Sequence, residues 1–247
     1  MKSFIKQVLL WNNIVFSRPP GQFSVDSVKL SNLRRRGFSP RLAIDGGADS
    51  GGWSKEFRKI FPDCQMLAIE PRQAAQAALE KTSKELGSFS IAQVALAESE
   101  RFTSFNEHGA QSSILNSNNG TRFGRTGEVK TTTLDLLLER MDLGFPDFIK
   151  LDLQGAELLC LEGAQKCLDK AVFIQLELSF IQLYEKSPLF DEVVAYMKQR
   201  GFICYDILGL WHRPLDGALA QGDFLFIRET HPLRSDKRWS DESTWCG

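Results

Sequence analysis

The sequence predicts an α/β protein built on a mostly parallel sheet, and two observations support that prediction. Short apolar runs alternate with segments of helical periodicity along most of the chain, which is the pattern of parallel strands joined by crossover helices. The runs at 147–155 and 171–179 are almost continuously apolar, so the strands that they form should be buried on both faces. With 247 residues, the chain can form one large domain with a sizeable core.

The remaining elements are assigned from the same periodicities. We expect helices at 24–36, 72–86, 134–141, 156–169 and 190–199, and strands at 42–45, 65–71, 89–97, 147–155, 171–179, 202–208 and 224–228. Two alternating stretches, 102–105 and 128–132, could pair as an accessory hairpin around the polar loop 106–127. Loops of this length are usually functional or disordered, and we favour a lid over a substrate or cofactor site.

Composition argues for a small-molecule ligand. A net charge of -1 gives no electrostatic reason to expect nucleic acid or an acidic membrane as a partner. The five cysteines are odd in number and contain no CxxC pair, so neither a disulfide framework nor a zinc site is indicated. Ordinary fractions of hydrophobic and charged residues favour a soluble, cytoplasmic protein.

The first 16 residues combine two lysines with an apolar patch. Asn12 and Asn13 interrupt that patch, which is much shorter than the roughly 20 residues that a membrane span needs. No small-residue cleavage site follows. We therefore expect an amphipathic helix that docks on the domain, with peripheral membrane contact as the alternative and no integral membrane segment.

The segment 41–54, RLAIDGGADSGGWS, is the strongest local sign of a ligand site. A short apolar run reaches Asp45, four glycines then form a tight turn, and a helical pattern begins at Trp53. Glycine is used where the backbone takes a positive φ or approaches a ligand closely. The segment therefore predicts a strand, a turn and a helix start that together bind a polar ligand. The alternative is a glycine-rich connector without a binding role.

Acidic residues follow several of the predicted strands. Asp45, Glu70, Asp152 and Glu177 each fall at or near a strand end, where open parallel sheets bind their ligands. Glu70 comes 25 positions after Asp45, close to the spacing of the acid that takes two ribose hydroxyls in dinucleotide folds. The glycines do not follow the GxGxxG order, which favours an adenosine-bearing methyl donor over a nicotinamide cofactor.

Four blocks of the sequence together resemble the FkbM-type S-adenosylmethionine-dependent methyltransferases. They are IDGGADSGGWS at 44–54, IEP at 69–71, TLD at 133–135 and the most specific, FIKLDLQGAELLCLEGA, at 148–164. Weaker agreement comes from LELSF at 176–180 with Tyr184, from GDFLFIR at 222–228 and from SSIL at 112–115. The resemblance covers about residues 42–228 and implies a seven-stranded class I methyltransferase sheet whose last strand is antiparallel and lies beside the fifth.

The resemblance also implies which residues bind S-adenosylmethionine. Asp45, Gly47 and Ala48 should approach the methionine part, Glu70 the ribose, Ala95 and Leu96 the adenine, and Asp152 and Gln154 the amino-acid end. The same blocks add three further cofactor-site residues, which are Gly51, Ser54 and Pro71. The chain departs from the family pattern at Asp49, where asparagine is usual, so the contacts of this turn are open.

These assignments divide the chain into three parts. We expect a helical cap at 1–40, a methyltransferase domain at 41–230 and a polar tail at 231–247.

Methyl transfer to an oxygen requires an aligned acceptor and a base that removes its proton. The candidate bases are His212, Asp152 and Glu177, with His108 ranked lower and His231 lowest. His212 lies in LGLWHRPLDG at 208–217, where Trp211 and Arg213 could bind an acceptor, although an exposed surface histidine is an equal alternative. In the polar loop, Ser112 and Ser113 are further candidates for substrate binding.

The resemblance favours O-methylation of a hydroxyl on a sugar or secondary metabolite as the activity. The alternatives are a cofactor-binding scaffold without turnover and, less favoured, a nicotinamide-dependent oxidoreductase. We expect no resident metal, because no dense ligand motif is present; if a divalent cation were bound, Asp152 and Glu177 would hold it.

Overall fold

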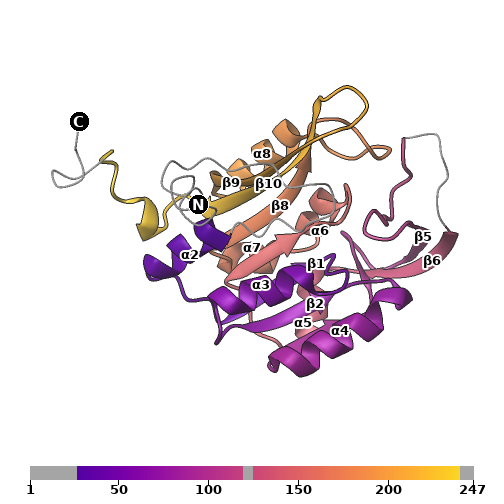
Figure 1. The fold of residues 1–247 in the computed structure, drawn as a ribbon, viewed down its shortest axis with the longest axis horizontal. Helices are drawn as coiled ribbons and strands as arrows, with labels where there is room; N and C mark the ends of the chain where they lie inside the picture. Colours follow the sequence, from indigo (N-terminus) through magenta and orange to yellow (C-terminus); the bar gives the residue numbers. More distant parts are fainter. Residues whose placement is uncertain (1–26, 119–124, 240–247) are drawn as a thin grey trace, which may run out of the picture.

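The computed structural model describes residues 27–118 and 125–239, and its central feature is a seven-stranded sheet (Figure 1). In spatial order, the strands are β3 (Phe89–Ala92), β2 (Gln65–Ile69), β1 (Leu42–Gly46), β7 (Phe148–Leu151), β8 (Phe173–Ser179), β10 (Leu219–Arg228) and β9 (Phe202–His212). Strands β3, β2, β1, β7 and β8 are parallel, whereas β10 runs antiparallel to both of its neighbours. The predicted α/β class and the insertion of the last strand beside the fifth are confirmed.

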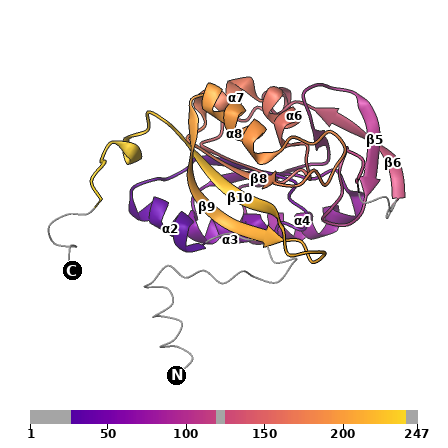
Figure 2. The same ribbon diagram turned by 90° about the horizontal axis from the view of Figure 1, so that it is seen from above.

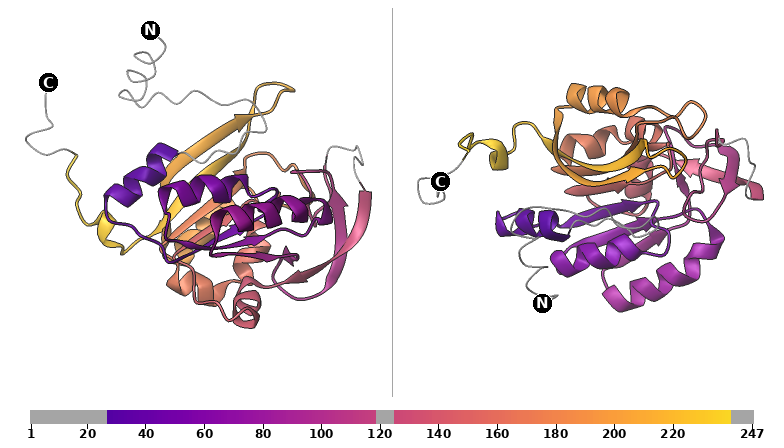
Figure 3. Two further views of the ribbon diagram at one scale, coloured as in Figure 1. Left: turned by 60° about the horizontal axis from the view of Figure 1, so that its bottom comes forward. Right: turned by 45° about the horizontal axis from the view of Figure 1, so that its top comes forward.

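Helices cover both faces of this sheet, as Figures 2 and 3 show. One face carries α2 (Ser27–Arg35), α3 (Gly52–Ile60) and α4 (Gln73–Leu86), whose buried side chains share one apolar cluster. The other carries α5 (Leu134–Arg140), α6 (Glu157–Glu162), α7 (Gln165–Lys170) and α8 (Phe190–Gln199), which pack into a second cluster. Because both faces are covered, the strands in the middle of the sheet are buried throughout, as their continuous apolar runs predicted.

A smaller, three-stranded sheet projects beside the main one. Its strands are β4 (Ala95–Leu96), β6 (Arg125–Thr132) and β5 (Phe102–Glu107) in spatial order. Strands β5 and β6 pair antiparallel, which confirms the predicted accessory hairpin. The sheet lies at one end of the ribbon in Figure 1 and places the polar loop beside the carboxyl ends of the parallel strands.

Two predicted elements are each divided in two, and the strand expected at 147–155 ends at Leu151. The expected strand 89–97 is divided into β3 and β4, and the second part pairs with β6 instead of continuing in the main sheet. The expected helix 156–169 is divided into α6 and α7 at Gly163, where a Cβ atom would lie 2.5 Å from the Ala97 carbonyl oxygen. Asp135, from the TLD block, then accepts hydrogen bonds from the backbone N–H groups of Lys166 and Cys167 at the start of α7.

The final hairpin is longer than the sequence predicted. Strands β9 and β10 extend to His212 and Leu219, so the segment 208–217 is mostly strand and turn. The residues after β10 form one short 3-10 helix, η1 (Pro232–Arg234), and the part of the expected polar tail at 240–247 lies outside the described residues.

The predicted N-terminal cap is described only in part. Residues 1–26 lie outside the described residues, and so does the expected docking helix at the start of the chain. Helix α2 belongs to the expected cap and contacts the main domain, because Arg34 donates to the Ile60 carbonyl at 2.8 Å and Lys29 lies 3.1 Å from Asp206. Across 27–118 and 125–239, none of the helices has the length and apolar character that crossing a membrane requires.

Candidate cofactor and active site

A pocket lies at the carboxyl ends of β1, β2 and β7, under the polar loop that follows β5. Its volume is about 610 Å³, counted with the part that opens to solvent. Predicted site residues that line it are Gly47, Glu70, Pro71, Ala95, Leu96, Ser112, Ser113, Asp152 and Gln154. Ligand sites of parallel sheets lie at this edge, so the fold and the pocket agree.

The glycine turn after β1 is pressed against the end of β7. Gly47 has φ +71°, and a Cβ atom on it would lie 1.9 Å from the Asp152 carbonyl oxygen, so only glycine fits. The N–H groups of Gly47 and Ala48 both donate to the Ile69 carbonyl, at 3.0 and 3.1 Å. The turn is therefore fixed between β2 and β7 and forms a rigid floor for one end of the pocket.

Lys150 holds the same turn from below. Its ammonium lies 3.2 Å from Asp45 Oδ1 and 3.6 Å from Asp152 Oδ2, and donates to the carbonyls of Gly46 and Gly47 at 3.3 and 3.1 Å. Burial alone would lower the pKa of Lys150, but the two carboxylates outweigh it and raise that pKa. Lys150 is consequently charged, and its charge connects the acid of β1 to the end of β7.

Several residues that were predicted to contact the cofactor lie beneath the pocket. Asp45 is fully buried and accepts a hydrogen bond of 2.6 Å from the Ser54 hydroxyl. Ala48 is buried, and a Cβ atom on Gly51 would lie 3.0 Å from Thr82 of α4. In this structure, Asp45, Ala48, Gly51 and Ser54 shape the turn and do not line the pocket.

Glu70, at the end of β2, lines the pocket with a carboxylate that is already hydrogen bonded. Its Oε1 accepts from the backbone N–H and the Nε of Arg72, at 2.9 and 3.0 Å. Its Oε2 accepts from the backbone N–H of Asp49 at 2.9 Å and, more weakly, from Arg72 Nη2 at 3.4 Å. Arg72 Nη2 also contacts the Asp49 carboxylate, so one guanidinium is shared by two acids.

The polar loop after β5 forms a roof over the pocket. Gly109, Ala110 and Ile114 line the pocket from this loop together with Ser112 and Ser113, and Phe105 lines it from β5. The Ser113 hydroxyl donates to the Gln154 carbonyl at 2.8 Å, whereas the Ser112 hydroxyl donates to Gly109 within the loop at 2.6 Å. Residues 106–118 of the loop that we expect to be a lid form this roof, and 119–124 lie outside the described residues.

The segment after β8 holds the far side of this roof. The N–H of Glu185 donates to the Asn116 carbonyl at 2.7 Å, and the N–H of Asn118 donates to the Leu183 carbonyl at 2.9 Å. The Tyr184 hydroxyl lies 3.3 Å from the Gln111 carbonyl. The roof is therefore tied to the segment 183–185 as well as to Gln154.

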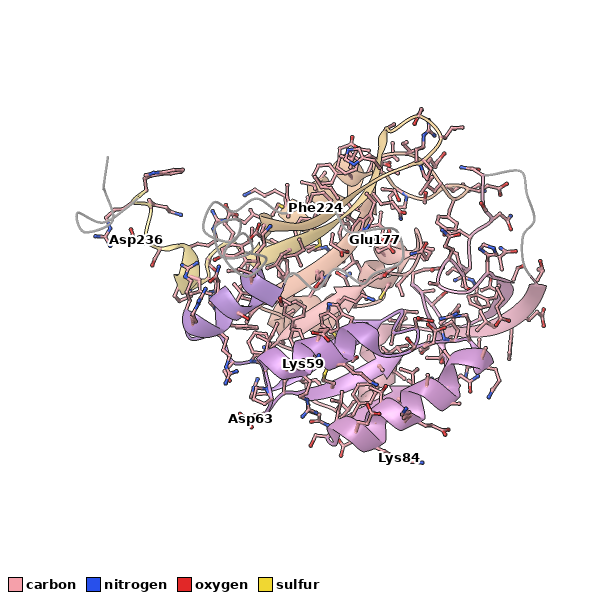
Figure 4. The ribbon with its side chains drawn as sticks, viewed as in Figure 1. Lys59, Asp63, Lys84, Glu177, Phe224 and Asp236 are labelled. Atoms are coloured by element: carbon pink, nitrogen blue, oxygen red, sulfur yellow. The ribbon has the colours of Figure 1, made fainter. Side chains whose placement is uncertain are left out.

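Beside the pocket, one amide connects the two acids that were predicted to be catalytic. Gln154 Nε2 donates to Asp152 Oδ1 at 2.7 Å and to Glu177 Oε2 at 2.9 Å. Tyr184 donates to Gln154 Oε1 at 2.7 Å, and Gln221 of β10 donates to Glu177 Oε2 at 2.9 Å. Figure 4 labels Glu177, which belongs to β8, near the middle of the molecule in this view.

The two acids of this network differ in their surroundings. Burial, Asp152 and Asp223 raise the pKa of Glu177 well above its usual range, which favours its protonated form. Burial and the nearby Glu177 also raise the pKa of Tyr184, which therefore stays a hydrogen-bond donor. Asp152 lines the pocket with a side chain that is 24% exposed, and this makes it the acid within reach of a ligand.

The turn that presents Gln154 is held by a second buried acid. Gln154 and Gly155 have positive φ values of 53° and 94°. Glu157 Oε1 accepts from the N–H groups of Leu153 and Gly155 at 2.7 and 3.3 Å. Burial raises the pKa of Glu157 to about 7, although these backbone hydrogen bonds oppose the shift.

The predicted acceptor-binding residues on the final hairpin lie away from the pocket lining. His212 is exposed at the end of β9, and the Arg213 guanidinium binds both oxygens of Asp216 across the turn, at 2.8 and 2.6 Å. Neither of them lines the pocket, and Trp211 does not line it either.

The other two histidines are placed differently. His108 belongs to the roof loop, where its backbone N–H donates to Ser112 Oγ at 2.8 Å. His231 packs near Phe173 at the start of β8, with ring centroids 6.1 Å apart, and so lies at the amino end of the sheet. Burial lowers the pKa of His231.

A metal would find few ligands at this site. Asp152 and Glu177 are the two residues expected to hold a divalent cation if one were bound. The Gln154 amide lies between them and donates to both. Among the side chains of 27–118 and 125–239, no group of three or more histidine, cysteine, aspartate or glutamate residues is arranged to hold an ion.

Several residues of this site were not predicted from the sequence, among them Lys150, Arg72 and Gln221. Lys150 had a usable signal, because it is a charged residue inside a buried apolar run. Arg72 directly follows the IEP block and looked like an ordinary first residue of a helix. Gln221 gave no signal, since its partner Glu177 is brought to it only by the pairing of β10 with β8.

The raised pKa of Glu157 predicts a pH-dependent stability. Because the pKa rises from 4.5 to about 7 on folding, this group favours the folded state fully below pH 4.5, and that contribution is lost as the pH rises through about 7. Glutamine fixes the neutral form, so Glu157→Gln should gain up to about 3 kcal/mol in unfolding free energy over the wild type between pH 5 and pH 8. Urea unfolding at both pH values measures this difference.

The control is Glu162→Gln, which removes one negative charge from the exposed side of the same helix. A difference between wild type and Glu157→Gln that stays constant with pH would contradict the assignment.

The chain is similar to several known proteins. The chain is 27% identical over 159 residues to the 2-O-methyltransferase NoeI of Sinorhizobium fredii, an overlap of 58% of this chain and 65% of that protein, so less than two thirds of that relative is spanned. Similar solved structures include a precorrin-6y C5,15-methyltransferase from Geobacter metallireducens (10% identity, TM-score 0.47, 86% of this chain and 93% of that one). Another is a SAM-dependent methyltransferase from Agrobacterium tumefaciens (11% identity, TM-score 0.48, 83% of this chain and 61% of that one).

The family model described as a methyltransferase FkbM domain matches residues 45–204, which is more than half of the chain and contains Asp45, Glu70, Asp152 and Glu177. Since the sheet order is that of a class I methyltransferase and the pocket lies within the matched residues, this protein belongs to the FkbM methyltransferase domain family.

Proposed function

We propose that this protein binds S-adenosylmethionine in the pocket under the roof and transfers its methyl group to a hydroxyl of a small molecule. One observation carries the proposal. The Gly47 turn, which leaves no room for a side chain, and the Glu70 carboxylate face the same pocket at the carboxyl ends of adjacent strands. The turn lets a ligand approach the backbone closely, and the acid can accept hydrogen bonds from two adjacent hydroxyls. Both features fit an adenosyl ligand.

The pocket lining suggests how the ligand is held. Glu70 would accept the ribose hydroxyls, since a carboxylate offers acceptor sites on both oxygens. Ala95 and Leu96 would pack on the adenine, and Gly47 would adjoin the methionine part, whose amino-acid end faces Asp152 and Gln154. When bound, S-adenosylmethionine supplies a sulfonium-activated methyl group, and the protein's contribution is to align the acceptor behind it.

The acid network favours Asp152 as the general base. The acceptor oxygen forms a bond to the methyl carbon while the carbon–sulfur bond breaks, and the hydroxyl proton passes to Asp152. Burial and the neighbouring acids raise the pKa of Glu177, and its protonated form cannot take up a further proton. Gln154 fixes Asp152 by donating to Oδ1, which leaves Oδ2 for the acceptor proton beside the charge of Lys150.

The acceptor is proposed to be a sugar or a secondary metabolite. The 2-O-methyltransferase name of the curated relative supports oxygen as the methylated atom. The Asp152 carboxylate lines the pocket, and its negative charge disfavours a phosphate backbone and favours a neutral polyol. We further propose that 41–230 forms the methyltransferase domain and that α2 is part of its cap.

Two glycines provide a direct test of the cofactor pocket. Gly47 and Gly217 both have positive φ values, of 71° and 74°, so alanine strains the backbone at either position. A Cβ atom at Gly217 meets nothing within 4 Å, whereas at Gly47 it would collide with Asp152. In calorimetric titrations, S-adenosylhomocysteine should bind the wild type and Gly217→Ala alike and should not bind Gly47→Ala.

Circular dichroism would verify that each variant is folded. If Gly47→Ala does not fold, Glu70→Ala replaces it. Glu70→Ala should bind S-adenosylhomocysteine more weakly by about 1–3 kcal/mol, because the hydrogen bonds from the ligand to a charged acceptor are lost. A wild type without affinity for S-adenosylhomocysteine would refute the proposed function, and binding without methyl transfer to any acceptor would instead favour a scaffold.

The assignment of the base predicts different effects for the two neighbouring acids. Asp152→Asn should lower kcat by about a hundredfold to ten-thousandfold, because the proton acceptor is lost. Glu177→Gln should lower it far less, since glutamine resembles the protonated acid. Transfer of a radiolabelled methyl group to a panel of monosaccharides and oligosaccharides measures both, and an equal loss in the two variants would contradict the assignment.

A further inference from the structure

The Glu70 carboxylate has no acceptor position left in this structure. A carboxylate offers about four lone-pair positions, two on each oxygen. On Oε1 they accept from the backbone N–H and the Nε of Arg72; on Oε2 they accept from the backbone N–H of Asp49 and from Arg72 Nη2. Two hydroxyls can therefore bind Glu70 only if two of these donors leave.

The four donors are of two kinds. Two are backbone N–H groups, one from the turn after β1 and one from the start of α4, and neither can move without unfolding its segment. The other two belong to one guanidinium, whose Nε and Nη2 contact the two carboxylate oxygens side by side. Rotation of the Arg72 side chain alone frees one position on each oxygen, which is what a pair of adjacent hydroxyls requires.

We propose that the Arg72 guanidinium occupies, in the free protein, the two positions on Glu70 that the ribose hydroxyls take, and that the ligand exchanges for it while Asp49 retains it. The inference rests on the proposed function, because it assumes an adenosyl ligand. Arg72 is thus a positioning residue that keeps a buried acid paired until the ligand arrives.

Asp49 provides the second partner that such an exchange needs. Its carboxylate already contacts Arg72 Nη2, so the guanidinium need not break every ion pair when it leaves Glu70. Arg72 is only 8% exposed, and a charge released there without a partner would be costly. Burial alone would lower the pKa of Arg72, but the hydrogen bonds that it donates to Glu70 and Asp49 outweigh burial and raise that pKa.

The backbone at Asp49 explains why an acid is useful at this position. Asp49 has φ +46°, a conformation that both aspartate and asparagine adopt more readily than most residues. Asparagine would fit the turn equally well but could not form an ion pair with Arg72. The departure from the asparagine expected here therefore has a role in holding the arginine.

The exchange also sets a specificity. A ligand that lacks both ribose hydroxyls offers no donors to replace the guanidinium and leaves Arg72 on Glu70. Removing the arginine should consequently tighten the binding only of ligands that carry the ribose hydroxyls.

Calorimetric titration of the full chain tests the exchange with two ligands, S-adenosylhomocysteine and its analogue without the 2′ and 3′ hydroxyls. Arg72→Met should bind S-adenosylhomocysteine roughly three- to tenfold more tightly than the wild type, because a charge-assisted pair no longer has to be broken. Its affinity for the analogue should not change. Asp49→Asn should weaken binding of S-adenosylhomocysteine, and should have no effect when combined with Arg72→Met.

The matched control is Arg140→Met. Arg140 also contacts both oxygens of one acid, Glu100, but this pair is exposed and outside the pocket lining. If Arg72→Met does not fold, Arg72→Lys replaces it, since a single ammonium cannot cover both oxygens and should also tighten binding.

The outcomes separate this inference from the proposed function. A wild type that does not bind S-adenosylhomocysteine refutes both. A wild type that binds, with affinity unchanged or weakened in the Arg72 variants, overturns the exchange alone. Equal tightening for the ligand with hydroxyls and the analogue would also overturn it, because the arginine would then act through charge and not through the hydroxyls.

Discussion

The buried contact between Lys150 and Asp45 is the interaction on which the rest of the site depends. The two residues lie opposite each other on the neighbouring central strands β7 and β1, and their side chains are 4% and 0% exposed. A buried charge is costly unless it is paired and fully hydrogen bonded. Here the carbonyls of Gly46 and Gly47 and the Asp152 carboxylate complete the surroundings of the ammonium, so stabilising the charge also fixes the glycine turn.

From this fixed centre the site extends in two directions along the sheet edge. Towards β2, the turn presents the Asp49 N–H to Glu70, and Arg72 closes that end. Towards β8, Gln154 joins Asp152 to Glu177, and Tyr184 joins Gln154 to the roof loop. The side chains at both ends of this chain of contacts bind one another, so the pocket is preformed before a ligand binds.

The sequence could predict the sheet and the position of the pocket because both follow from local patterns. Apolar runs mark the strands, and Glu70 and Asp152 follow those strands directly, so the topology alone brings them to one edge. It could not distinguish residues that line the pocket from those beneath it, such as Ser54, whose hydroxyl binds Asp45. Tyr184 and Gln221 reach the site from distant segments, and their partners depend on side-chain packing that no local pattern records.

The central proposal is that an adenosyl ligand binds between the glycine turn and the roof, with its ribose on Glu70. The most direct measurement is the structure of a crystal of the protein soaked with S-adenosylhomocysteine. We expect ribose hydroxyls within hydrogen-bond distance of both Glu70 oxygens, the adenine against Ala95 and Leu96, and the amino-acid end near Asp152. Ligand density in any other part of the molecule, or a ribose that does not contact Glu70, would contradict it.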